Sequence, residues 1–220
     1  MVIPDALLLI TGGCPHCPAM HQALTGLLKE GVIGRLEVIN VAVHTEAAEE
    51  RNVQSVPWTK IGPYEIQGVV PTSELKRYAQ GVDNEAVFDA YVLDLLKTGK
   101  RARFEALVKH EPKRIHALAR LMTNPETSMA IRLGIGAVLE EFQGTGLTQP
   151  LVPELGVLLN SDDPLLRADA CHFLTLIGGE EVRPYMEACL NRTDAELHEM
   201  AQEWLGESSQ EAQLIRHREE

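Results

Sequence analysis

Two cysteines, separated by two residues, follow the first apolar run of this sequence. The run Ala6–Thr11 has the length of an interior strand, and Cys14 and Cys17 follow it closely. Apolar residues then recur at helical spacing from Pro15 to Glu30. The cysteines therefore lie where a predicted strand passes into a predicted helix. A redox dithiol, half of a metal site and a pair of merely structural cysteines are the three interpretations of such a pair.

The predicted helix start gives the two cysteines different properties. The first turn of a helix leaves backbone N–H groups unpaired, and the helix dipole adds partial positive charge there. We expect Cys14 at the cap position, with a pKa below the ordinary value of about 8.5. Pro15 suits the first helical position, and an exposed His16 would favour the thiolate further. Cys17, one turn in, is expected to be buried and protonated, so Cys14 should attack a disulfide and Cys17 should resolve the mixed disulfide.

The first eighty residues alternate between strand and helix patterns. Further strands are predicted at Leu36–Val41, Trp58–Ile61 and Tyr64–Gln67, and further helices at His44–Arg51 and Thr72–Gln80. The order is β-α-β-α-β-β-α, with the last two strands forming a hairpin. The first two strands are expected to be parallel, because a helical crossover joins them.

This order, the sequence Cys14-Pro15-His16-Cys17 and the segment "SVPW" at Ser55–Trp58 resemble the thioredoxin superfamily. The resemblance implies an α/β thioredoxin-like domain, which we place at residues 1–83. It also implies that Pro57 lies in a cis-proline loop against the cysteines. Val56–Pro57 is then predicted to be cis, with the backbone of Val56 contacting an incoming peptide substrate.

Two departures leave the direction of electron flow open. Gly13 stands where thioredoxin itself has tryptophan, and the strand Leu7–Leu9 lacks the buried acid of thioredoxin. The Cys-Pro-His-Cys sequence looks instead like the disulfide-oxidase branch and some glutaredoxin-like proteins. A more stable thiolate makes the corresponding disulfide more oxidising. Reductase, oxidase and isomerase roles are therefore all compatible with the motif.

Strand patterns cease at about residue 84. One helix, Glu85–Lys97, is expected to bridge the two halves at residues 84–98, and Lys97–Arg103 reads as a solvated helix start rather than a nucleic-acid patch. Helices then come in pairs, at Ile115–Phe142, Leu151–Gly178 and Val182–Gly206. The middle pair resembles HEAT repeats at Asp163-Pro164, Arg167 and Ala170. We therefore predict an all-α, HEAT-like domain at residues 99–206 and a polar tail at 207–220.

Charge, hydropathy and cysteine number limit the partners and the cellular compartment that we expect for this protein. The formal charge of −12 disfavours nucleic-acid binding, and no segment is long enough to cross a membrane. Asp5 stands where a secretion signal would be basic, so we expect a cytoplasmic protein. Four cysteines are too few for a disulfide framework.

The candidate metal ligands and the two remaining cysteines indicate no second functional site. Zinc at Cys14 and Cys17 would need two further ligands. His21, four residues after Cys17, and His44 are the candidates, and neither forms a second paired motif. We therefore expect no metal and no cofactor. Cys171 and Cys189 lie in the middle of predicted helices, where cysteine is commonly a small buried hydrophobe. That interpretation is preferred to a second redox pair.

Two functions follow from these features. The first is a thiol–disulfide oxidoreductase that acts on protein disulfides through Cys14 and Cys17, with the helical half binding the substrate or a partner protein. The alternative is an interaction scaffold whose partner binding is gated by the redox state of the dithiol, with little turnover. Intact cysteines together with Pro57 favour the enzyme.

Overall fold

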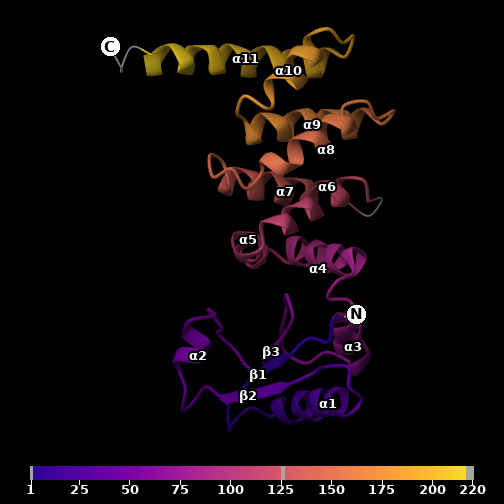
Figure 1. Ribbon diagram of the computed structural model, residues 1–220, viewed down its shortest axis with the longest axis vertical. Coiled ribbons are helices and arrows are strands. Elements are labelled where there is room, and N and C mark those ends of the chain that lie inside the picture. Colours follow the sequence, from indigo (N-terminus) through magenta and orange to yellow (C-terminus); the bar gives the residue numbers. More distant parts are fainter. Residues whose placement is uncertain (1, 125–126, 217–220) are drawn as a thin grey trace. The chain divides into compact units, whose positions relative to one another are not determined.

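The computed structural model describes residues 2–124 and 127–216, and the chain divides into two compact units. Unit 1 is Met1–Tyr91 and unit 2 is Val92–Glu220. The division falls inside the helix α4 (Glu85–Lys97), whose predicted bounds are confirmed. Unit 1 is an α/β unit and unit 2 is helical, so the predicted fold class is confirmed (Figure 1).

A four-stranded sheet organises unit 1. The strands are β1 (Ala6–Ile10), β2 (Leu36–Asn40), β3 (Trp58–Ile61) and β4 (Tyr64–Gln67), in the spatial order β2-β1-β3-β4. β1 runs parallel to β2 and antiparallel to β3, and β3 pairs with β4 in an antiparallel hairpin. The predicted strands, the hairpin and the parallel first pair are confirmed.

Helices cover both faces of this sheet. α1 (Cys17–Lys29) and α3 (Thr72–Gln80) contact each other and the sheet, whereas Ala47 of α2 (Glu46–Glu49) packs against Leu9 and Trp58. Leu8 and Leu9 point to opposite faces and are both fully buried. Coverage on both faces explains why β1 is a continuous apolar run rather than an alternating one. The element order is as predicted, although α2 is shorter than His44–Arg51.

An aromatic core joins the hairpin of unit 1 to the helices that follow it. Tyr64 of β4 is fully buried, with its ring centroid 4.6 Å from that of Tyr78 and 5.2 Å from that of Tyr91. Phe88 completes the cluster. The first turns of α4 therefore belong to the core of unit 1.

Unit 2 is built from helices that pack in sequence. Its α-helices are α5 (Arg101–His110), α6 (Ala117–Met122), α7 (Met129–Glu141), α8 (Val152–Leu158), α9 (Pro164–Ile177), α10 (Arg183–Leu190) and α11 (Ala195–Arg216). Short 3₁₀ helices, η1 at Pro112–His116 and η2 at Gln149–Leu151, precede α6 and α8. α5 contacts α7, α7 contacts α9 and α9 contacts α11, while α8 packs on α9 and α10 on α11 (Figure 1).

Two features of unit 2 differ from the sequence prediction. α5 is a complete helix with Phe104 and Val108 buried, where the sequence suggested only a helix start. α11 continues through residues 207–216, which were predicted as a polar tail, while residues 217–220 of that tail lie outside the described residues. Pro125 and Glu126, which lie within the predicted helix pair Ile115–Phe142, are also outside them. No helix among the described residues is long and apolar enough to cross a membrane.

Candidate redox site

Cys14 and Cys17 are joined by a disulfide at the end of β1. Their sulfur atoms are 2.26 Å apart and their Cα atoms 5.5 Å apart. The backbone N–H of Cys14 donates to the carbonyl oxygen of Thr11 at 3.3 Å, which closes the turn after the strand. Gly12 and Gly13 in this turn are exposed. A short, exposed turn therefore connects the end of β1 to the cysteine pair, and it places Cys14 near the surface.

The helix after this turn begins later than predicted. α1 starts at Cys17 with His16 as its N-cap residue, whereas the sequence placed Cys14 at the cap and Pro15 at the first helical position. The proline in the first helical turn is Pro18. Both prolines suit a helix start, because neither needs to donate a hydrogen bond there. Pro15 and His16 instead form the turn that spans the two cysteines.

The predicted interaction between sulfur and helix backbone is nevertheless present. The N–H of Cys17 donates to Sγ of Cys14 at 3.1 Å, so this sulfur accepts a hydrogen bond from the first residue of α1. Sγ of Cys14 thus meets the positive end of the helix dipole. The same contact would favour a negative charge on this sulfur after reduction.

The two cysteines differ in accessibility in the predicted sense. Cys17 is only 4% exposed, whereas Cys14 is half-buried. Pro15 and His16 between them are both exposed. Cys14 is therefore the more accessible of the two cysteines, while Cys17 is shielded.

The loop before β3 lies against Cys14, the more accessible cysteine. The carbonyl oxygen of Val56 is 3.7 Å from Sγ of Cys14, and the Val56–Pro57 peptide bond is cis, as predicted. Pro57 is buried, and its carbonyl oxygen accepts a hydrogen bond from the N–H of Gly68 at 2.8 Å. Val56 packs against the apolar cluster centred on Leu9. The backbone of this loop is thus held beside Cys14.

The two histidines considered as metal ligands do not complete a site with the cysteines. His21 is exposed on α1, and Nδ1 of His44 is 3.1 Å from Oε1 of Glu46 in a separate pair. Within residues 2–124 and 127–216, no group of three or more histidine, cysteine, aspartate or glutamate side chains is arranged to hold a metal ion.

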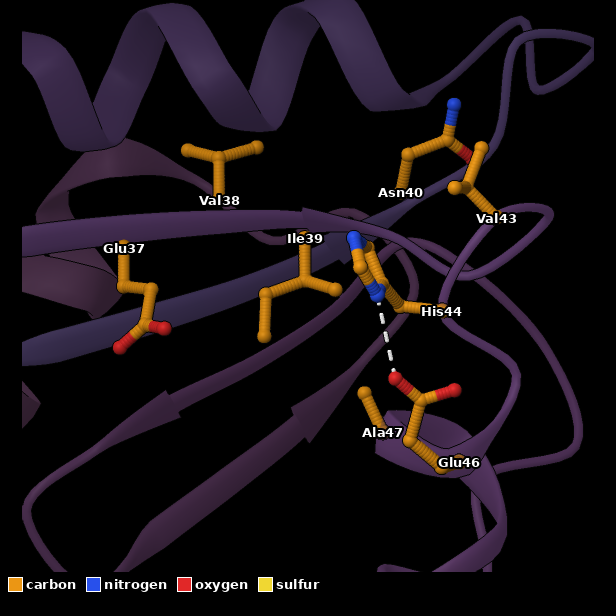
Figure 2. A pocket seen from close by; sticks show the side chains of 8 residues that line it. All are labelled: Glu37, Val38, Ile39, Asn40, Val43, His44, Glu46 and Ala47. Atoms are coloured by element: carbon orange, nitrogen blue, oxygen red, sulfur yellow. Dashed lines mark hydrogen bonds and ion pairs between the residues drawn. The ribbon is translucent and has the colours of Figure 1, made fainter.

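A cavity that no sequence pattern indicated lies along the edge strand β2. It has a volume of about 510 Å³ and is lined by Glu37, Val38, Ile39, Asn40, Val43, His44, Glu46 and Ala47. Figure 2 shows Val38 and Asn40 pointing to one face of the strand and Glu37 and Ile39 to the other. None of the residues that line this cavity belongs to the cysteine pair or its loop. The cavity is therefore distinct from the disulfide site.

Comparison with known proteins supports the assignment of unit 1. Residues 6–78 match the model of a thioredoxin domain family. No curated protein matches the chain. The matched segment begins with β1 and extends into α3, so it contains the sheet, both cysteines and Pro57. The family match, the four-stranded sheet and the Cys14–Cys17 pair together support a thioredoxin-superfamily domain in the N-terminal part of the chain.

Proposed function

We propose that the protein is a thiol–disulfide oxidoreductase that exchanges electrons with protein disulfides through Cys14 and Cys17. The observation that carries the proposal is the unequal access to the two bonded sulfurs, with Cys14 half-buried and Cys17 4% exposed. A coarser redox role already follows from the thioredoxin match and the bonded pair.

The more accessible cysteine, Cys14, starts the reaction from the reduced state. The thiolate of Cys14 attacks one sulfur of a substrate disulfide, forms a mixed disulfide and releases one substrate thiolate. Cys17 then loses its proton, attacks Sγ of Cys14 and releases the second substrate thiol. Two electrons pass to the substrate, and the chain ends with the Cys14–Cys17 disulfide. The reverse sequence oxidises a substrate dithiol.

Neighbouring residues take supporting roles in this proposal. The N–H of Cys17 and the exposed His16 stabilise the attacking thiolate of Cys14, with Pro15 shaping the turn between them. The backbone of Val56, held by the buried Pro57, offers hydrogen bonds to an extended substrate peptide. The distance of 3.7 Å between Cys14 and the Val56 carbonyl supports this role.

The helical half is proposed to bind the substrate or a partner protein. Stacked helix pairs of the HEAT type present extended surfaces to proteins. The succession of contacts from α5 to α7, α9 and α11 supports a HEAT-like repeat here. We place the reaction in the cytoplasm, where such a pair rests in the reduced dithiol form.

Single-cysteine variants test the enzyme directly. With dithiothreitol as the electron source, the whole chain should accelerate the reduction of insulin disulfides. Cys14→Ser should abolish this acceleration, because it removes the attacking sulfur. Cys17→Ser should instead accumulate a mixed disulfide through Cys14, visible on a non-reducing gel, because the resolving sulfur is absent. Cys171→Ala, a change in unit 2, is the matched control and should retain turnover.

The proposal fails if the wild-type chain adds nothing to the rate with dithiothreitol alone and no adduct forms on the Cys17→Ser variant. In that event, a difference in partner binding between the oxidised and reduced chain would favour the redox-gated scaffold.

A further inference from the structure

The strand β2 lies at an edge of the sheet of unit 1. Within the described part of the chain, β1 is the only strand that pairs with it. The carbonyl oxygen of Arg35 and the N–H of Val41 both bond to β1. Because backbone groups alternate in direction along a strand, Leu36 and Val38 direct their N–H and C=O groups away from the sheet. One further strand can therefore pair with β2 at this edge.

The turn that follows β2 limits the length of this edge. The carbonyl oxygen of Asn40 accepts hydrogen bonds from the N–H groups of Val43 at 3.1 Å and His44 at 3.0 Å. Oδ1 of Asn40 accepts from the N–H of Ala42 at 3.0 Å. The stretch that remains is centred on Val38, whose side chain is 38% exposed. An added strand of about five residues, a usual strand length, would cover it.

The cavity of about 510 Å³ described above runs along this edge, and we call it the β2 groove. Figure 2 shows Glu37 near one end of the groove and Glu46 near the other, with Ile39 between them. Ile39 and Ala47 both belong to the apolar cluster on this face of the sheet. The β2 groove thus has apolar side chains along its middle and a carboxylate near each end.

The two carboxylates can each accept a further basic group. Oε2 of Glu37 bonds to Arg35 at 2.7 Å, and Oε1 of Glu46 lies 3.1 Å from Nδ1 of His44. All four side chains are about half exposed or more, and ion pairs in such positions are weak. Each contact uses one oxygen, whereas an ionised carboxylate accepts several hydrogen bonds. A lysine or arginine on an added strand can therefore bond at either end of the groove.

Charge also decides between a peptide and a second copy of this chain. The antiparallel register that pairs the whole of β2 with a second β2 is centred on Val38. It places Glu37 opposite Ile39 of the other copy and diagonal to the other copy's Glu37, within reach of long side chains. The two carboxylates would repel each other, as would two chains that each carry a formal charge of −12. A basic segment gains free energy at the same positions.

We propose that the β2 groove binds an extended, basic peptide segment of another protein, which pairs with β2 as an additional strand of the sheet. Every second side chain of such a segment faces the groove. The pattern on that face is basic, apolar, basic, so that the apolar side chain packs on Ile39 and the basic ones meet Glu37 and Glu46. Backbone bonds to Leu36 and Val38 supply affinity, and the side chains supply selectivity. The groove is distinct from the disulfide site, so the inference does not rest on the proposed oxidoreductase.

The test titrates the full chain, isotopically labelled for NMR, with the peptide acetyl-SKTVTKS-amide. Its lysines and valine repeat the pattern of the groove, and the pattern reads the same in both strand directions. Binding should slow hydrogen exchange of the Leu36 and Val38 amides several-fold, because these N–H groups become bonded to the peptide. The peptide acetyl-SETVTES-amide, with the opposite charge, should leave them unprotected.

Methylation of the peptide backbone separates strand pairing from charge attraction. Only every second N–H of an added strand faces β2. One peptide is methylated at the two threonine nitrogens, and another at the nitrogens of the valine and the second lysine. One of the two should bind about tenfold more weakly, because two backbone hydrogen bonds are lost, while the other retains its affinity.

Variants of the chain test the carboxylates. Glu37→Gln and Glu46→Gln should each weaken binding several-fold, because each removes one charge from the groove. Glu49→Gln is the matched control, since Glu49 is exposed on α2 and does not line the groove. The proposal is overturned if the SKTVTKS peptide does not protect the two amides, if both methylated peptides bind equally, or if neither groove variant weakens binding. A free chain that is dimeric, with Leu36 and Val38 already protected, would instead assign this edge to a second copy.

Discussion

At the scale of single residues, one hydroxyl group connects the sheet of unit 1 to its helices. The Tyr64 side chain is fully buried, and its hydroxyl donates to the carbonyl oxygen of Gly81 at 2.7 Å. Gly81 ends α3, so this bond ties β4 to the turn that leads into α4. The Tyr64 hydroxyl thus has a partner away from water, where a donor without a hydrogen bond would lower the stability of the fold.

We expect Tyr64→Phe to lower the stability of unit 1 by about 1 kcal/mol, because the ring stays packed while one buried hydrogen bond is lost. Trp58, fully buried in unit 1, reports this unfolding by fluorescence when Trp204 is replaced by phenylalanine. Tyr78→Phe is the control, since its hydroxyl bonds to Oε1 of Glu74 at 3.2 Å on a partly exposed helix face, where water can substitute. Equal losses of stability in the two variants would contradict the role assigned to the Tyr64 hydroxyl.

The burial of the cysteine pair and the loop beside it were predicted better than the exact start of the helix that follows. The burial of Cys17 and the cis peptide before Pro57 were both expected and are both present. The start of α1 was misplaced because Pro15 and Pro18 are equally good as first-turn residues. The observed bounds of α1, which begins at Cys17 with His16 as its N-cap residue, show which start the chain adopts. Local patterns predict that a helix begins near the cysteines, whereas the folded turn determines the residue at which it begins.

At the scale of elements, a glycine sets the approach of two helices in unit 2. A Cβ atom added at Gly156 of α8 would lie 2.0 Å from the ring of Tyr185 of α10. That separation is far below van der Waals contact, so a side chain at position 156 requires the ring or a helix to shift. Glycine is therefore needed here for space rather than for backbone freedom.

We expect Gly156→Ala to destabilise unit 2 by about 1–3 kcal/mol, the usual cost of overpacking. Tyr185→Ala should remove the clash, so that adding Gly156→Ala to it becomes neutral or stabilising. Gly26→Ala in α1 is the matched control, because a Cβ there meets nothing within 4 Å and alanine favours a helix by about 1 kcal/mol over glycine. Hydrogen exchange of α8 and α10 measures the effect. Failure of Tyr185→Ala to rescue the variant would show that the ring is not the obstacle.

Elements with strong local patterns were predictable, and contacts between distant elements were not. The hairpin strands, α3 and α4 have the predicted bounds because turn residues and periodicity agree there. α5 was missed as a separate helix because its buried residues, Phe104 and Val108, are embedded among charged ones. The contacts of α9 with α7 and α11 depend on how the helices of unit 2 pack, which no local pattern encodes.

At the scale of the whole molecule, one helix contributes to two cores. Phe88 and Tyr91 of α4 pack with Tyr64 in unit 1. Leu96, near the other end of α4, is the residue that a Cβ on Gly134 of α7 would touch at 3.4 Å. The chain thus passes from unit 1 to unit 2 within α4, between Tyr91 and Val92. Each unit nevertheless has its own buried apolar residues, which is the condition for separate stability.

Because the two units have separate cores, we expect them to unfold separately. Combining Tyr64→Phe with Gly156→Ala tests this expectation. Tyr64 and Gly156 lie in different units, and their named partners, Gly81 and Tyr185, are not shared. Free-energy changes at such positions add to within about 0.5 kcal/mol. Gly156→Ala should therefore leave the Trp58 unfolding midpoint unchanged, and the double variant should show the Tyr64→Phe loss in unit 1 together with faster hydrogen exchange in α8. If Gly156→Ala moves the Trp58 transition as far as it moves exchange in α8, α4 couples the two cores into one cooperative unit.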